Sequence, residues 1–146
     1  MPGAVDHASI VNHWMKQAAN GLTSGQLLLL FEAAIAALCQ RAYLTLGDVT
    51  LTAVVDRVMY NAAEEFPLFE SLEPGTRGVN CRALLESMSG GNEVELTEGM
   101  RFVLVEFLTV IGNLTAEILT PALHSELSNV VLEARPSDRT KSREGK

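Results

Sequence analysis

The chain has 146 residues, of which 47 % are hydrophobic and only 20 % are charged, so it contains enough apolar material for one domain with a single core. Aromatic residues make up only 5 %, and the resulting mixture of Leu, Val and Ala favours helices over a β-sandwich. The two cysteines, Cys39 and Cys81, have no Cys-x-x-Cys spacing and indicate neither a disulfide framework nor a zinc knuckle.

Charge divides the chain into two parts. Residues 1–134 hold 6 Lys/Arg and 16 Asp/Glu, a sum of −10, whereas residues 135–146 hold 5 and 2, a sum of +3. The first part repels phosphate backbones, so we expect no nucleic acid partner. The second part has no apolar side chain to bury, and we expect a disordered basic tail after a helical domain that spans 1–134.

The apolar stretches are too short for a membrane span. Residues 27–39 are interrupted by Glu32, and residues 102–111 are interrupted by Glu106, whereas a spanning helix needs roughly 20 apolar residues. The first residues lack the positive and apolar regions of a signal peptide. We therefore expect a cytoplasmic protein without a membrane span.

The first two predicted helices have clear starts. Asp6 is a good N-cap for a helix that ends near Asn20, before a glycine. Thr23 and Gln26 have the Thr-x-x-Gln spacing of a capping box, and the following residues 27–43 are apolar on nearly every side. A helix of this kind belongs in the centre of the domain.

The middle of the chain predicts a peripheral helix, a loop and a short helix. The peripheral helix has one polar face, begins near Asp48 and ends at Phe66-Pro67, because the residue before proline avoids the α region. Residues 67–78 read as a loop with no strand, and residues 81–88 as a short helix.

The last predicted helix is the longest. It begins near Thr97, continues through Leu119 and ends near Ala134, with a kink or restart at Pro121. With this helix the predicted fold class is all-α, a helical bundle of about five helices, four long and one short.

Polar residues on this last helix fall within roughly 40° of one line. They are Glu106, Thr109, Asn113, Glu117, Thr120, His124 and Ser128. The line is either a narrow solvent face or a polar seam toward a partner helix or pocket, in which buried polar groups would set the register. Glu106, Asn113, Glu117 and His124 are accordingly the candidate binding residues.

The sequence supplies no catalytic or metal-binding constellation. None of the three histidines has a glutamate three residues before it, as a di-iron bundle requires, and His7 and His13 are too far round one helix to share a metal. No nucleotide-binding or nucleophile motif is present, and Cys81 has no histidine beside it in the sequence. We expect no metal, no cofactor and no catalytic residue.

The segment His124-Ser-Glu126-Leu127 resembles, over these few residues, the phospho-acceptor helix of histidine kinases. That resemblance implies an exposed imidazole at His124 with a nearby acid, Glu117 or Glu126, to orient it. Against it, Pro121 precedes the histidine instead of following it, and the chain has no Gly-rich ATP lid.

The apolar surplus of residues 27–43 and of the last helix exceeds what a monomer of this size hides. We therefore expect a non-enzymatic regulatory or adaptor domain that homodimerises or docks a partner helix through the surface of the last helix. The alternative is a signalling sensor or phosphotransfer module that uses His124, or a small apolar ligand between the two apolar helices. A small helical enzyme is a third reading, disfavoured because no base, nucleophile and anion site occur together.

Overall fold

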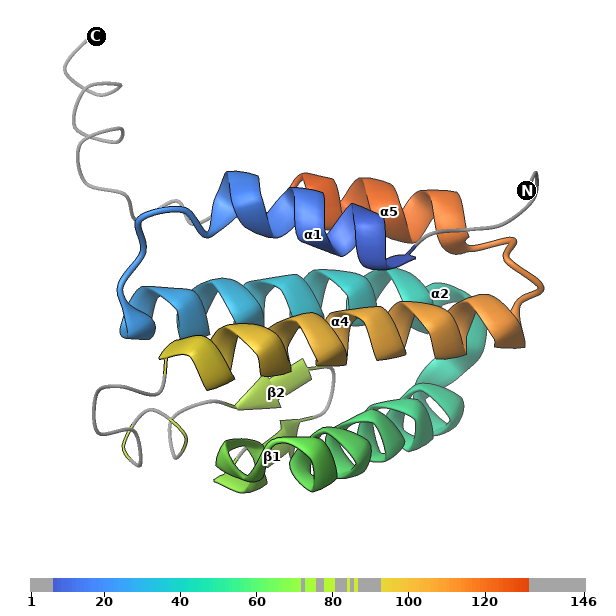
Figure 1. Ribbon diagram of the computed structural model, residues 1–146. Helices are drawn as coiled ribbons and strands as arrows, with labels where there is room; N and C mark the ends of the chain where they lie inside the picture. The colour runs from blue at the N-terminus through green and yellow to red at the C-terminus, as the bar shows by residue number, and fades with distance from the viewer. Residues whose placement is uncertain are drawn as a thin grey trace, which may run out of the picture.

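The computed structural model describes residues 7–71, 73–75, 78–80, 84, 86 and 93–131. Within these residues the helices are α1 (His7–Ala18), α2 (Ser24–Glu65), α4 (Glu93–Leu114) and α5 (Thr120–Ser128) (Figure 1). The fold is an all-α helical bundle, as predicted. Of the expected short helix at 81–88, the described residues Leu84 and Glu86 are helical, and the others lie outside the description. The expected basic tail at 135–146 also lies outside it.

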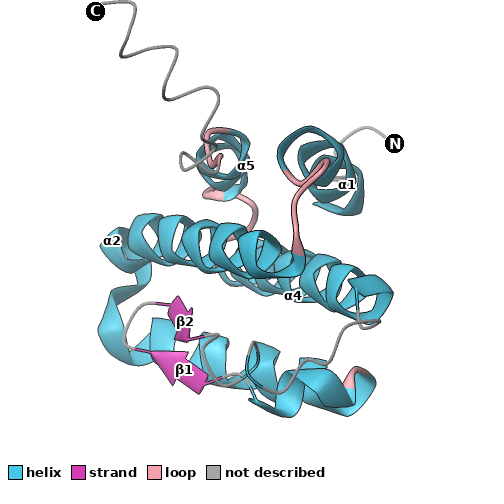
Figure 2. Cartoon of the chain, turned by 90° about the vertical axis from the view of Figure 1, so that its left-hand side faces the viewer, coloured by secondary structure: helices cyan, strands magenta, loops and turns pink. Residues whose placement is uncertain are grey.

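The helices form three layers (Figures 1 and 2). The helices α1 and α5 lie side by side in one outer layer, and the first half of α2 lies beside α4 in the middle layer. The second half of α2 turns back and forms the other outer layer with a small hairpin. The buried core is contiguous and consists mostly of Leu, Ile, Val, Phe and Ala from α2 and α4.

The helix α2 begins and ends where the sequence predicts. Thr23 Oγ1 accepts a hydrogen bond from the Gln26 backbone N–H at 3.2 Å, and Gln26 Oε1 accepts one from the Thr23 N–H at 3.0 Å, so the capping box is confirmed. At the other end Phe66 is extended, with φ −131° and ψ 94°. The two predicted helices form one helical run with a bend at Gly47, whose φ of 83° favours glycine.

The segment after α2 contains more regular structure than the predicted loop. Residues Pro67–Ser71 form the 3-10 helix η1, and β1 (Glu73–Gly75) pairs antiparallel with β2 (Gly78–Asn80). Strands of three residues are too short to show an alternating pattern in the sequence. The 3-10 helix is held by Phe69, which is 2 % exposed and contacts the rings of Phe31 and Phe66.

The predicted restart at Pro121 is confirmed, but the prediction that the helix continues through Leu119 is wrong. The helix α4 begins at Glu93, four residues earlier than predicted, and ends at Leu114; α5 then runs from Thr120 to Ser128 and ends before the predicted Ala134. Pro121 lies in the first turn of α5, where its missing N–H leaves no helical hydrogen bond unmade. The proline therefore starts a new helix and does not kink an old one.

The chain leaves α4 through a turn at residues 115–119. Ala116 and Glu117 have positive φ values of 52° and 65°, which no helix contains. The Glu117 N–H donates to the Gly112 carbonyl at 2.7 Å, and the Thr115 hydroxyl donates to the Ile111 carbonyl at 2.9 Å. These bonds satisfy carbonyls of the last helical turn and close the end of α4.

The helix α2 is long and apolar enough, by length and composition alone, to cross a membrane. Half of its most apolar window is buried inside the structure, and the core helix of a soluble protein meets the same criterion. The bend at Gly47 and the packing of α2 on α4 and α5 agree with a core helix. The absence of a membrane span remains a prediction.

Candidate functional site at the contact of α1 and α5

The structure separates the four predicted site residues. Glu106 is half-buried on α4, and its Oε2 accepts a hydrogen bond from Asn61 Nδ2 on α2 at 3.2 Å. Asn113 is exposed near the end of α4, Glu117 lies in the turn after it, and His124 lies on α5. Because residues 115–119 are not helical, the predicted polar line is broken between Asn113 and Glu117.

Two of these residues, Glu117 and His124, meet a third that the sequence did not indicate. His7, the first residue of α1, places its Nδ1 3.0 Å from Nε2 of His124. The two rings are nearly perpendicular, with an interplanar angle of 85° and centroids 5.1 Å apart. His7 is only 8 % exposed and His124 is half-buried. The contact therefore joins the start of α1 to α5 through one hydrogen bond between imidazoles.

The carboxylate of Glu117 approaches the other nitrogen of His7. Its Oε1 lies 3.7 Å from His7 Nε2 and accepts a hydrogen bond from the Thr120 hydroxyl. The carboxylate also lies against bare backbone, since a Cβ atom on Gly112 would stand 2.6 Å from Oε1. The left-handed turn and the small Gly112 thus bring Glu117 to His7, and the four side chains form the imidazole cluster (His7, Glu117, Thr120, His124).

Geometry indicates how the protons are arranged in the imidazole cluster. The hydrogen bond between the rings forms when Nε2–H of His124 donates to Nδ1 of His7. Nε2 of His7 is then left facing the Glu117 carboxylate at 3.7 Å, beyond hydrogen-bond distance, and has no hydrogen-bond partner among the described residues. Burial lowers the pKa of His124 below its ordinary value of 6.5, a charge on His7 lowers that pKa further, and the charge on Glu117 opposes both effects. His124 is therefore a neutral imidazole at neutral pH.

The chemistry available in the described part of the chain is limited. Its residues contain no group of three or more His, Cys, Asp or Glu side chains that could hold a metal ion. Cys39 is buried, and burial raises the pKa of its thiol to about 12, so it is not a nucleophile at neutral pH. In the imidazole cluster, Nε2 of His124 faces His7, and phosphorylation at that nitrogen would require the hydrogen bond to break.

The importance of His7 could not be read from the sequence. It lies 117 positions from His124, and only the side-by-side packing of α1 and α5 brings the two together. The sequence pattern relates His7 only to His13, as a possible pair of metal ligands, and His13 is exposed on the same helix. A pair of histidines near the two ends of a domain carries no periodic signal, so the tertiary structure was needed to find it.

A second candidate surface is the outer side of α2 before its bend. Leu29 is 54 % exposed and Leu44 is 73 % exposed, and Ala33, Ala36 and Gln40 are exposed between them. We call these five residues the α2 face. On α4, by contrast, the large exposed apolar side chains are at the two ends, Val94 and Leu114. Ile118 and Val131 are also exposed but lie outside the helices. The α2 face is therefore a stripe along a helix, whereas on α4 the exposed large apolar side chains are confined to its two ends.

Comparison with known proteins does not add to these observations. No protein-family model, no curated protein and no solved structure matches this chain. A function must be argued from the imidazole cluster, the α2 face and the hollows of the surface, without analogy to a relative.

Proposed function

We propose that the chain is a non-enzymatic helical domain of regulatory or adaptor type, which acts by pairing with a second copy of itself through the α2 face. The observation that carries the proposal is the uncovered apolar stripe itself: four of its five exposed residues are apolar. Exposed apolar surface on an acidic domain, whose residues 1–134 sum to −10, is typical of an interaction site.

The spacing of the α2 face suits a helical partner. Its members follow each other at intervals of four, three, four and four residues, close to the repeat that forms a seam between two helices. Leu29 and Leu44 supply large side chains at the ends, and Ala33 and Ala36 supply small ones in the middle. Small residues at a helix crossing let the two backbones approach closely.

The arrangement is also complementary to itself. The midpoint between Ala36 and Ala37 is equally far from Leu29 and Leu44, and equally far from Ala33 and Gln40. In an antiparallel pair centred there, Leu29 of one copy lies level with Leu44 of the other. A symmetric dimer needs such a self-complementary patch, which is why a second copy is the occupant we propose. A different helical protein on this face is the competing outcome.

The proposal includes a cytoplasmic protein without a membrane span. The burial of α2 between α4, α5 and η1 supports it, because a helix whose other side forms the core of the domain exposes only one stripe. No observation favours the phosphotransfer alternative, because Nε2 of His124 is hydrogen-bonded to Nδ1 of His7.

The first test is the mass of the protein in solution. We expect light scattering to show a dimer for the unmodified chain and a shift toward monomer for Leu44→Glu, because a buried, unpaired carboxylate destabilises the interface. Val49→Glu is the matched control: Val49 is 85 % exposed, lies after the bend of α2 and is outside the α2 face, so the dimer should persist. A strict monomer at concentrations up to about 0.5 mM would refute pairing.

A second test locates the interface. In a Cys81→Ser background, Ala36→Cys places a thiol beside the proposed two-fold axis, and a short bifunctional maleimide should cross-link two chains through it. Val49→Cys is far from that axis and should give no cross-linked dimer. A dimer that persists while Ala36→Cys fails to cross-link would place the interface elsewhere and overturn the assignment to the α2 face.

A further inference from the structure

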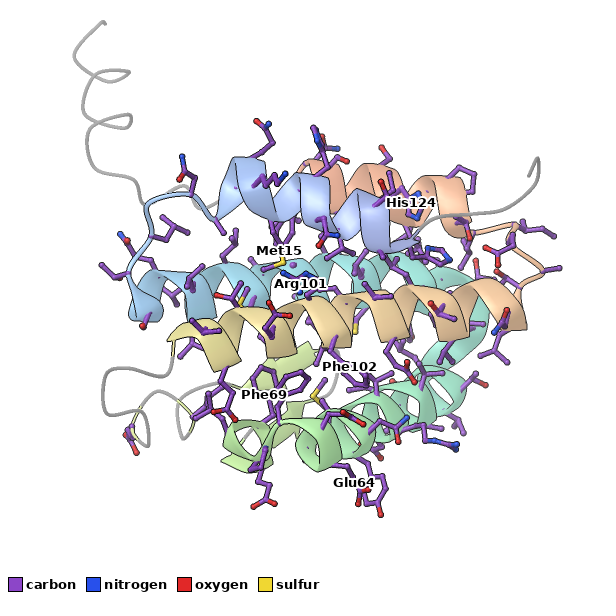
Figure 3. All side chains as sticks on the ribbon, in the orientation of Figure 1. Met15, Glu64, Phe69, Arg101, Phe102 and His124 are labelled. Atoms are coloured by element: carbon purple, nitrogen blue, oxygen red, sulfur yellow. The ribbon has the colours of Figure 1, made fainter. Side chains whose placement is uncertain are left out.

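A hollow of about 570 Å³ lies between α1 and α4, on a different surface from the α2 face and the imidazole cluster. Its lining includes Asn12, Met15 and Lys16 from α1, Ala19 just after that helix, Leu27 from α2 and Arg101 from α4. In Figure 3, Met15 and Arg101 point from these two helices toward the same space. The volume lies within the range of sites that hold small molecules.

Cations converge on this hollow although the chain is acidic overall. The described residues contain four Lys and Arg side chains, and two of them, Lys16 and Arg101, line it. They come from different helices, and α1 carries no Asp or Glu between His7 and Ala18. In a chain of net charge −7, this concentration produces a local positive potential where an anion would be attracted.

Arg101 has hydrogen-bonding capacity to spare. Its Nη1 donates to Glu98 in an ion pair one helical turn away, while its Nε is buried without a hydrogen-bond partner among the described residues. A guanidinium carries five N–H donors, so a ligand carboxylate can accept from those that the pair with Glu98 does not use. The three charges of Lys16, Arg101 and Glu98 sum to +1, so a monoanion neutralises the site and a dianion leaves an excess negative charge.

The other side of the hollow is apolar. Met15 and Leu27 belong to the hydrophobic core and also line the hollow, and Ala19 is packed against that core. A fully solvated inorganic anion gains nothing from this surface, whereas a hydrocarbon chain or ring removes it from water.

We propose that this hollow binds a small amphipathic monocarboxylate, with the carboxylate between Lys16 and Arg101 and the apolar part on Met15, Ala19 and Leu27. The planar guanidinium of Arg101 suits a carboxylate, which can accept two hydrogen bonds from it. The ligand therefore matches both properties of the hollow: its carboxylate neutralises the net positive charge, and its apolar part covers the apolar side chains.

Titration with octanoate, followed by amide chemical shifts, tests the proposal. We expect saturable shifts around Met15 and Arg101, whereas acetate, which lacks the apolar part, and octanol, which lacks the charge, bind at least about tenfold more weakly. Octanol that binds as tightly as octanoate would overturn the role of the two cations. Absence of saturable octanoate binding would overturn the site.

Variants assign the binding to the named side chains. Arg101→Gln and Lys16→Gln should each weaken octanoate binding by about tenfold, the usual effect of losing one charge-assisted hydrogen bond. Glu98→Gln should tighten it, because the local charge rises and Arg101 is released. Arg57→Gln removes an exposed cation outside the hollow and serves as the matched control. An equal loss in Arg57→Gln would show attraction to the whole chain and refute a built site.

Discussion

The first stability prediction concerns Gly99 of α4, which lies against the ring of Phe69. A Cβ atom added to Gly99 would stand 2.5 Å from both Cε1 and Cζ of Phe69 and 3.1 Å from its Cδ1. Phe69 is buried, and its ring already contacts Phe31 and Phe66 at centroid distances of 6.1 and 6.2 Å. Because a close-packed core resists displacement, Gly99→Ala must push the ring and η1 with it.

Two effects of opposite sign decide the outcome of Gly99→Ala. Alanine is favoured over glycine in a helix interior by about 1 kcal/mol. Overpacking a core costs about 1–3 kcal/mol, and contact with two ring atoms of a buried side chain places this substitution at the upper end. We expect a net loss of about 2 kcal/mol in the free energy of unfolding, which for a chain of this size lowers the melting temperature by roughly 4–8 °C.

Urea unfolding followed by circular dichroism measures this loss, and a double-mutant cycle isolates its cause. In a Phe69→Leu background the ring is absent, so the same Gly99→Ala change should be neutral or stabilising. Gly25→Ala is the control, because a Cβ atom there meets no atom within 4 Å. If Gly99→Ala stabilises the unmodified chain, or costs the same in both backgrounds, the argument from the close approach is wrong.

Three further predictions concern other parts of the fold. Because the pKa of His124 is lowered on folding, the unfolded chain binds more protons as the pH falls below 6.5, so stability is complete above that pH and is lost on acidification. His124→Gln should therefore lose stability less steeply between about pH 7 and pH 5 than the unmodified chain, as thermal melts at several pH values will show. Equal slopes in the two proteins would contradict this role of His124. Ala116→Gly should raise the free energy of unfolding by about 1 kcal/mol, because it removes a side chain at φ 52°. The control Ala53→Gly, in an exposed helical position, should lower the free energy of unfolding. A lower free energy of unfolding for Ala116→Gly would contradict the left-handed turn. Thr23→Ala should cost about 1 kcal/mol in the same unfolding assay, since it removes the side-chain half of the capping box, and Thr23→Ser should restore it.

The predictable part of the fold was the part encoded over a few neighbouring residues. The capping box at Thr23 and Gln26 needs only a three-residue spacing, and the structure confirms it. The end of α2 at Glu65 follows from the restriction that Pro67 places on Phe66, and the structure confirms that too. In both places the local preference and the tertiary packing agree, so the sequence pattern suffices.

The break between α4 and α5 was not predictable in the same way. Residues 115–119 include Ala116 and Glu117, which are compatible with a helix, and the apolar periodicity continues through them. After the break, Leu119 and Leu123 are buried in the core, so the new direction of the chain is stabilised by contacts that are distant in the sequence. Packing of these side chains outweighs two positive φ values, each of which costs about 1–2 kcal/mol.

Two of the four residues predicted for the site belong to the imidazole cluster, and the other two do not. Glu117 and His124 were selected as members of a helical line, and both contact His7, but through a turn and a new helix that the line did not contain. Glu106 and Asn113 belong to the same line and lie elsewhere, one bonded to Asn61 and the other exposed. A helical wheel holds only while the helix is continuous, and α4 ends between these two pairs.

The imidazole cluster also explains why α1 and the end of the described chain form one layer. His7 contacts His124 and Glu117, and seven residues later the Trp14 indole N–H donates to the Val130 carbonyl at 2.9 Å. The first residue and the middle of α1 are thus tied to the segment 117–130, while the apolar side of α1 rests on α4. Hydrogen bonds fix direction and register, whereas apolar burial supplies the attraction. The position of α1 therefore depends on polar contacts with the far end of the chain, and Lys16, which lines the hollow, is carried on that same helix.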